Sequence, residues 1–307
     1  QSYSIASGTD VNMSHSRSIA LSADATANKL FVIGTNRDDI CRVDMGIDYW
    51  VQEAKLTPPF TADSQKQNFG HAISIDDRGT KISVSTKKYN EYGGSSGNEA
   101  GISYIYRKVG STWYYTKALQ ASNIGGSDKF GGANSLSGDG GYLIVGAFEE
   151  DTGSSNAGSS YIFSAPVISS GTTITQYLTT ETRIQHSDVG TNQDYFGRAI
   201  ALDTDGNTAI VSASHEDTDA GNAGRCYIFV KSDAGTWSEQ YDFGSGVTQA
   251  NSYFGLSGVS ISGDGNVALA GKPSQDSGRV AIHTRSGTSW SSYGALTGEV
   301  NDGKFGS

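Results

Sequence analysis

The dipeptide Phe-Gly recurs along this chain at intervals of 51 to 66 residues. Its copies begin at Phe69, Phe130, Phe196, Phe254 and Phe305. Each of the first four is followed by an apolar segment, a turn sequence, a second apolar segment, a polar loop and a third segment that is aromatic in most copies. A period of this length with about four strands per unit is typical of a repeat array or a β-propeller. The repeat therefore restricts the fold class before any single residue is considered.

The first two segments of a unit have the residue patterns of inner propeller strands. In the copy at Phe196, the side chains of Phe196, Ile200 and Leu202 share one side and small residues interleave with them. Small side chains let inner strands approach closely around an axis. The second segments, such as 208–213, are almost continuously apolar, which suits strands that are buried on both faces.

The turns between these two segments contain Asp-Gly or a near equivalent. They are Asp77-Arg78-Gly79, Asp139-Gly140, Asp205-Gly206 and Asp264-Gly265. Tight hairpins need positive φ angles, which Gly, Asp and Asn tolerate. We therefore assign these carboxylates to turn formation. The third segments are aromatic and three of the fourth segments carry Trp (Trp113, Trp237 and Trp290), which we interpret as packing between blades.

These patterns predict an all-β fold, a β-propeller of four-stranded antiparallel blades. Five full repeats cover approximately residues 12–63, 64–125, 126–190, 191–249 and 250–300. The first repeat is degenerate, because His15-Ser16 stands where Phe-Gly is expected. Residues 1–11 and 301–307 look like partial blades. We therefore expect residues 1–307 to be a single propeller domain or a fragment of one, favour the fragment, and expect a complete ring of roughly six or seven blades.

Composition and charge argue against two classes of partner. The chain has 22 Lys and Arg against 32 Asp and Glu, for a net charge of -10. Nucleic-acid binding needs a basic patch, and the longest basic run is Lys87-Lys88. There is no apolar run of about 18 residues that would insert into a membrane.

Cys41 and Cys226 fall in non-adjacent repeats, so we expect two unpaired thiols.

The repeat resembles the FG-GAP repeat, the unit of the β-propeller at the head of integrin α subunits and of many bacterial, algal and viral surface proteins. The matching residues are Phe130-Gly131 with Ile-Val-Gly-Ala at 144–147, Phe196-Gly197 with Ile-Val-Ser-Ala at 210–213, and, less fully, Phe254-Gly255 with Leu-Ala-Gly at 269–271. The resemblance implies a propeller located outside the cell, on a cell surface or on a virion surface. Integrin-type repeats often carry a calcium loop between the first two strands, but the best copy here, at 203–207, lacks the downstream carboxylate.

The loops between second and third strands are the most elaborate, and they carry the candidate metal ligands. Glu150, Asp151, Asp217 and Asp219 are candidate ligands for calcium, the one cofactor considered. Calcium takes about six to eight oxygen ligands, and these loops supply part of that set. The same carboxylates can instead accept backbone amides and shape the turns. The incomplete ligand set leaves both interpretations open.

Sequence motifs give little support to catalysis. The five histidines show no metal-binding spacing with cysteine, and neither a Gly-x-Ser-x-Gly elbow nor a phosphate loop is present. The inner strands consist mainly of Ala, Ser, Ile and Leu rather than charged residues. We therefore expect no enzyme, and a propeller lyase or hydrolase is the least favoured alternative.

A binding face is the leading functional hypothesis. In a four-stranded meander, the second-to-third loops share one face with the connections 120–128, 186–194 and 244–253, and long loops on a rigid scaffold commonly carry recognition. We expect an extracellular or particle-surface module for adhesion, protein–protein interaction or assembly of a larger appendage, matrix or fibre. Its partners would be other subunits, copies of itself or surface glycans. The alternative is a carbohydrate-binding module that uses Tyr89, Tyr92 or Tyr253 as sugar platforms.

Overall fold

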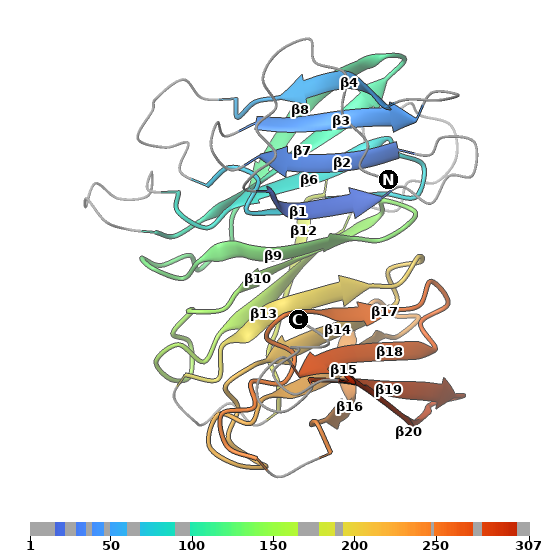
Figure 1. Ribbon diagram of the computed structural model, residues 1–307. Helices are drawn as coiled ribbons and strands as arrows, with labels where there is room; N and C mark the ends of the chain where they lie inside the picture. Colours follow the sequence, from blue (N-terminus) through green and yellow to red (C-terminus); the bar gives the residue numbers. More distant parts are fainter. Residues whose placement is uncertain are drawn as a thin grey trace.

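The computed structural model describes residues 54–59, 68–89, 99–164, 178–187, 193–246, 249–272 and 278–299, and the backbone of strands within 16–53. All regular structure in these residues is β-strand. The strands form five four-stranded antiparallel sheets, one after another along the chain. Each sheet is a propeller blade in which strands are joined in sequence order (Figure 1). The all-β propeller prediction is confirmed.

The five blades are numbered here in chain order. Blade 1 contains β1 (Ser16–Leu21), β2 (Lys29–Gly34), β3 (Asp39–Met45) and β4 (Trp50–Leu56). Blade 2 contains β5 (Ala72–Ile75), β6 (Lys81–Thr86), β7 (Ile102–Val109) and β8 (Thr112–Leu119). Blade 3 contains β9 (Phe130–Leu136), β10 (Tyr142–Ala147), β11 (Ser159–Ser164) and β12 (Thr180–Ile184). Blade 4 contains β13 (Phe196–Leu202), β14 (Thr208–Ala213), β15 (Arg225–Lys231) and β16 (Trp237–Phe243). Blade 5 contains β17 (Val259–Ile261), β18 (Val267–Lys272), β19 (Arg279–Ser286) and β20 (Ser289–Thr297).

The first strands of successive blades lie side by side and form the inner edge of the propeller. Contacts join β1 to β5, β5 to β9, β9 to β13 and β13 to β17. The second strands are the most deeply buried, since every residue of β6 and β14 is buried. The fourth strands are more exposed, as β8 and β20 illustrate. This gradient from axis to rim agrees with the sequence patterns. The partial blades predicted at 1–11 and 301–307 lie outside the described residues.

The hydrophobic core lies between blades rather than inside one. Each cluster combines side chains from two neighbouring blades. Between blades 3 and 4, Ile144 and Ile162 pack with Phe196 and Tyr227. The Phe rings of the Phe-Gly copies at 69, 130, 196 and 254 are almost completely inaccessible to solvent. A blade therefore depends on its neighbours for burial, because its own sheet has an apolar surface on each face.

The Phe-Gly copies also join the blades through the backbone. In three copies the amide N–H of the Phe donates to the carbonyl of an Ala in the second-to-third loop of the preceding blade. The pairs are Phe130 and Ala100 (2.8 Å), Phe196 and Ala157 (2.9 Å), and Phe254 and Ala223 (2.9 Å). The same dipeptide thus supplies a buried ring and a hydrogen bond at each of these three junctions.

The tight turns at the opposite end of the blades form a second set of junctions. The amide of Asp77 donates to the carbonyl of Gly138 (2.9 Å), and the amide of Asp139 donates to the carbonyl of Thr204 (3.0 Å). The amide of Thr204 in turn donates to Gly263 (3.0 Å). Buried Asp203, in the closest match to a calcium loop, accepts the amides of Asn207 and Thr208 in its own turn.

We predict that Gly146→Ala destabilises the protein strongly. A Cβ at this position would lie only 2.0 Å from the carbonyl oxygen of Gly197 in the next blade. We expect a loss of about 2 kcal/mol or more in the free energy of unfolding, because the two backbones must separate. Urea denaturation of this variant and of Gly221→Ala, where nothing lies within 4 Å of the added Cβ, measures the effect. Equal stability of the two variants would contradict the close approach.

We also predict that the thiol of Cys226 is inert in the folded protein. Cys226 is a free, fully buried cysteine, and burial raises the pKa of its thiol well above the usual range. The side chain of Cys41 lies outside the described residues, so the test uses the Cys41→Ser variant. A colorimetric thiol assay should detect no thiol before denaturation and one afterwards. Rapid reaction of the folded variant would contradict this packing.

Candidate functional site

The elaborate loops gather at one end of the propeller, called the loop face below. It comprises the second-to-third loops, such as 148–158 and 214–224, and the connections between blades, such as 120–129. Backbone hydrogen bonds tie loops to connections: Gln193 donates to Ser155 (2.8 Å) and Asn251 donates to Gly221 (2.7 Å). The predicted common face is therefore present, and neighbouring blades build it jointly.

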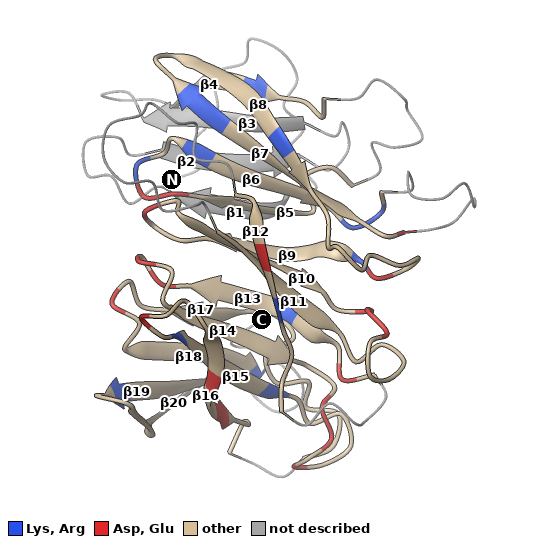
Figure 2. Cartoon of the chain, turned by 180° about the vertical axis from the view of Figure 1, so that it is seen from behind, with Lys and Arg blue, Asp and Glu red and all other residues tan. Residues whose placement is uncertain are grey.

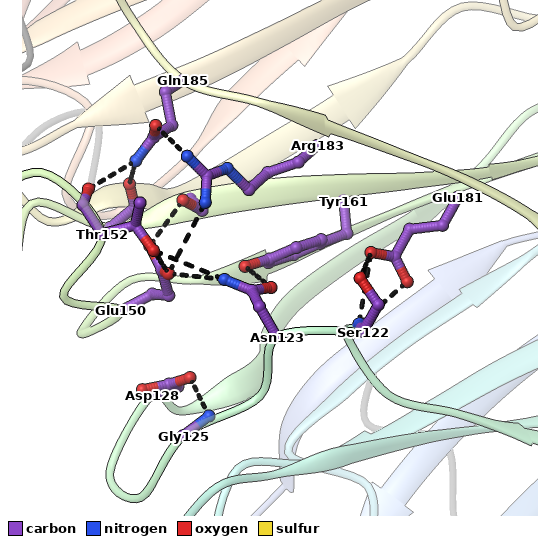
Figure 3. Close-up of polar contacts among 12 residues, drawn as sticks. Ser122, Asn123, Gly125, Asp128, Glu150, Thr152, Tyr161, Glu181, Arg183 and Gln185 are labelled. Carbon is purple, nitrogen blue, oxygen red and sulfur yellow. Dashed lines mark hydrogen bonds and ion pairs between the residues drawn. The ribbon is translucent and has the colours of Figure 1, made fainter.

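In blade 3, the predicted calcium ligands Glu150 and Asp151 are engaged in hydrogen bonds. Glu150 is buried, and its carboxylate accepts Asn123 Nδ2 (2.8 Å) and the hydroxyl of Ser159 (2.7 Å). Figure 3 shows Arg183 and Gln185 of the fourth-strand region converging on the same loop. Asp151 accepts the amide of Asn156 (2.9 Å) across its own loop. These contacts stabilise the loop shape.

In blade 4, the predicted ligands Asp217 and Asp219 point to different partners. Asp217 accepts the amide of Asn222 and closes the loop, as Asp151 does in blade 3. Asp219 forms an ion pair with Arg225 (3.0 Å). Within the described residues, no group of three or more His, Cys, Asp or Glu side chains is arranged to hold a metal ion. Calcium binding at these four residues stays a prediction.

The residue before each Phe-Gly copy has a left-handed backbone conformation. The φ angles are 64° at Asn68, 58° at Lys129, 54° at Tyr195 and 49° at Tyr253. Asn adopts this conformation easily, whereas a bulky aromatic residue there is strained. Such strain costs on the order of 1–3 kcal/mol and is concentrated at functional sites. Blades 4 and 5 thus hold two tyrosines on the loop face at an energetic cost.

These tyrosines belong to a continuous group of four rings and one guanidinium, called the inner cluster. Its members are Phe148, Tyr195, Arg198, His215 and Tyr253. The His215 ring lies between the two tyrosines, with centroid distances of 4.6 Å to Tyr195 and 4.8 Å to Tyr253. Tyr195 also contacts Phe148, and the Arg198 guanidinium lies 4.4 Å from the Phe148 ring centroid. Residues of three blades therefore meet beside the inner strands.

The inner cluster favours a neutral imidazole. Burial lowers the pKa of His215 below its usual range, and the nearby Arg198 guanidinium lowers it further. Apart from Phe148, the members of the cluster are only partly buried. Aromatic rings, a neutral imidazole and one cation form a surface suited to contact with polar and aromatic groups of a partner.

A buried carboxyl group supports the loop face in blade 3. Asp128, two residues before Phe130, accepts the amide of Gly125 (Figure 3). Burial raises the pKa of Asp128 to about 6, and the neighbouring Glu150 and Asp151 raise it as well. Asp194 occupies the equivalent position in blade 4 and is also fully buried.

Sequence reasoning missed the inner cluster and placed one platform wrongly. Tyr89, a predicted sugar platform, is buried, and it packs among the core side chains between blades 1 and 2. Tyr92 lies outside the described residues. Tyr253 is half-buried in the inner cluster. Aligning the residues that precede each Phe-Gly copy would have revealed Tyr195 and Tyr253, whereas the packing of His215 between them depends on the fold.

Comparisons with known proteins agree with the observed architecture. The fold defines the class as a β-propeller of four-stranded blades. Residues 113–163 and 179–229 match the model of the FG-GAP repeat family. These two segments therefore carry FG-GAP repeats. No curated protein matches the sequence. No helix in the described residues has the length and apolar character to cross a membrane.

Similar solved structures share the fold at low sequence identity. A functionally unknown protein from Desulfotomaculum acetoxidans is 10% identical with a TM-score of 0.56, and the match covers 92% of this chain and 70% of that one. A protein from Lactobacillus plantarum is 10% identical with a TM-score of 0.57, covering 91% and 70%. A candidate 6-phosphogluconolactonase from Bacteroides uniformis is 12% identical with a TM-score of 0.55, covering 89% and 69%. At such identities the likeness concerns the fold alone.

We predict that Asp128→Asn stabilises the protein at pH 7.5 but not at pH 4. The pKa of Asp128 is about 6 in the folded chain and 3.8 ordinarily. The folded state therefore holds this proton more tightly, and its stability falls as pH rises from about 4 to 6. The Asn variant avoids that loss, which amounts to about 1–3 kcal/mol.

Thermal and urea unfolding at both pH values measure the effect of Asp128→Asn. Asp233→Asn, an exposed position, serves as the matched control and should leave the difference between the two pH values unchanged. A variant at Asp128 that is less stable than the parent at pH 7.5 would show that the carboxylate is stabilised in the fold, contrary to this prediction.

Proposed function

We propose that this chain is a non-enzymatic recognition module and that the inner cluster is the centre of its binding surface. The observation that carries the proposal is the strained backbone of Tyr195 and Tyr253. Asn68 in blade 2 adopts the same conformation with less strain, and Lys129, which has no ring, precedes an intact junction in blade 3. The two tyrosines therefore contribute something other than the junction itself, and their place on the loop face suggests contact with a partner.

The proposed setting is outside the cell or on a particle surface, in adhesion or in assembly of a larger appendage, matrix or fibre. The FG-GAP repeat family supports this setting. The surface is acidic, with a net charge of -10, and most of the Asp and Glu residues in the described part lie in the loops at both ends of the strands (Figure 2). An acidic loop surface with a central aromatic group favours a specific partner over nonspecific attachment to other acidic surfaces. Other subunits or copies of this chain are the proposed partners.

Two alternatives lead to different expectations. Surface glycans would use the same aromatic rings as platforms, with Tyr253 the one sequence-predicted platform that belongs to the inner cluster. A lactonase-like activity is suggested by the description of some structural neighbours, but these share only 12% identity with this chain. We therefore retain the non-enzymatic proposal.

We predict that Tyr195→Asn and Tyr253→Asn weaken recognition without weakening the fold. Protein-coated beads are tested in three assays: mixed with uncoated beads, mixed with one another, and placed on glycan-printed surfaces. The number of adhering beads is counted in each assay. We expect at least a fivefold loss of adhesion for each variant, with thermal stability close to that of the parent because Asn adopts the left-handed conformation at less cost. Tyr114→Ala, at an exposed position of β8, is the control. Full adhesion by both variants would exclude the inner cluster as the binding centre.

A further inference from the structure

A pocket lies on the loop face between the outer parts of blades 4 and 5, and it shares no residue with the inner cluster. Its volume is about 330 Å³. Its lining combines charged, aromatic and hydroxyl side chains, including Arg225, Asp242, Tyr241, Arg279, His283 and Ser292. This volume is at the lower end of the range for small-molecule sites, about 300–1,000 Å³. The pocket therefore suits one small polar unit.

Arg225, at the blade 4 side of the pocket, is fully neutralised by the protein. Its Nε and Asp242 Oδ2 form a charge-assisted hydrogen bond, and its Nη1 lies 3.0 Å from Asp219 Oδ1. These two carboxylates raise the pKa of Arg225 despite the opposing effect of burial. The positive charge of Arg225 is therefore not available to a ligand.

Arg279 occupies the position of Arg225 in the next blade but lacks the matching carboxylate. Both arginines follow a Gly and begin the third strand of their blades. In blade 4, Tyr227 pairs with Asp242 across the ladder. In blade 5, the equivalent residue Ala281 pairs with Ala295. One of the two carboxylates that neutralise Arg225 is therefore replaced by a methyl group beside Arg279.

The charge of Arg279 is consequently available in the pocket. Its Nε is buried and has no hydrogen-bond acceptor, and no carboxylate of the described residues forms an ion pair with its guanidinium. A buried guanidinium N–H without an acceptor is costly, and a bidentate carboxylate ligand would satisfy it. The planar fork of arginine matches the geometry of a carboxylate especially well.

The other walls of the pocket indicate what surrounds that carboxylate. Phe243 and His283 stack with centroids 3.9 Å apart, and Tyr241 stacks on Phe243 at 5.9 Å. Phe243 and His283 are buried, and partly buried Tyr241 adds apolar surface that a ligand ring can contact. Burial lowers the pKa of His283, which favours the neutral imidazole. Asp219 and Asp242 are each bound to Arg225 through one oxygen, and carboxylate oxygens accept hydrogen bonds from hydroxyl groups.

We propose that this pocket binds a uronic acid unit of an acidic glycan, with Arg279 as the partner of its carboxylate. The sugar ring lies against the aromatic wall, and its hydroxyl groups donate to Asp219 and Asp242. A simple carboxylate without hydroxyl groups would meet two acidic side chains and gain less. The proposal is independent of the inner cluster, so either can fail while the other stands.

The test is a titration of the folded protein with sodium glucuronate and sodium galacturonate, followed by calorimetry. Glucose, acetate and an acidic tripeptide are the comparison ligands. We expect saturable binding of at least one uronate, at least tenfold tighter than that of glucose, acetate or the tripeptide. Arg279→Gln should weaken uronate binding at least tenfold.

Two further variants separate a binding role from a structural one. Ala295→Asp copies the arrangement of blade 4, so it should neutralise Arg279 internally and abolish uronate binding in a protein at least as stable as the parent. Arg285→Gln removes a positive charge at the opposite end of β19, where Arg285 Nε bonds to Asn266 (3.0 Å), and should leave the affinity unchanged.

Three results would overturn the proposal. The first is absence of saturable binding by either uronate. The second is acetate or the tripeptide binding as tightly as the uronates, which would exclude a sugar-specific pocket. The third is unchanged uronate affinity in a folded Ala295→Asp protein, which would exclude Arg279 as the partner of the carboxylate.

Discussion

The junction formed by the Phe-Gly dipeptides at Phe130, Phe196 and Phe254 is the interaction on which the rest of the described structure depends. The Phe ring fills the space between two blades, the Phe amide bonds to the preceding blade, and the Gly allows close approach of the two backbones. Because each core cluster is shared between neighbours, a single blade has no complete core of its own. Burial and hydrogen bonding at the same residue make the blades cooperate.

The same junction determines what the loop face presents. The carbonyl that receives the Phe amide belongs to a second-to-third loop, so the bond holds that loop against the next blade. The residue before Phe is forced into a left-handed conformation, and its side chain then lies on the loop face. In blades 4 and 5 that residue is Tyr, with His215 between the two rings. A structural constraint of the repeat thus places the residues of the proposed recognition surface.

The rim of the propeller illustrates a different principle. Equivalent positions of successive blades carry the same arginine, yet one is neutralised and the other is not. Divergence at one cross-strand neighbour, Asp242 against Ala295, removes one of the two carboxylates that neutralise Arg225. Repeats that keep their packing residues can therefore acquire individual surface chemistry at low structural cost.

Much of the fold could be predicted from the sequence, because the features that encode it are local and repeated. Phe196 with its alternating small neighbours, and turns such as Asp205-Gly206, indicate strand and hairpin directly. The site is less predictable. Tyr89 is an aromatic residue beside a polar loop, yet it packs into the core, and only tertiary contacts separate it from Tyr253. Whether a carboxylate neutralises Arg279 depends on the register between β19 and β20, which cannot be read from the sequence.

Hydrogen exchange at the Phe-Gly amides tests the central claim most directly. The N–H groups of Phe130, Phe196 and Phe254 each donate across a blade junction beside a buried ring. If these junctions hold the blades together, the three amides should be among the slowest to exchange, and they should exchange at the rate of global unfolding. Exchange as fast as that of exposed loop amides, in a protein that remains folded, would contradict the account.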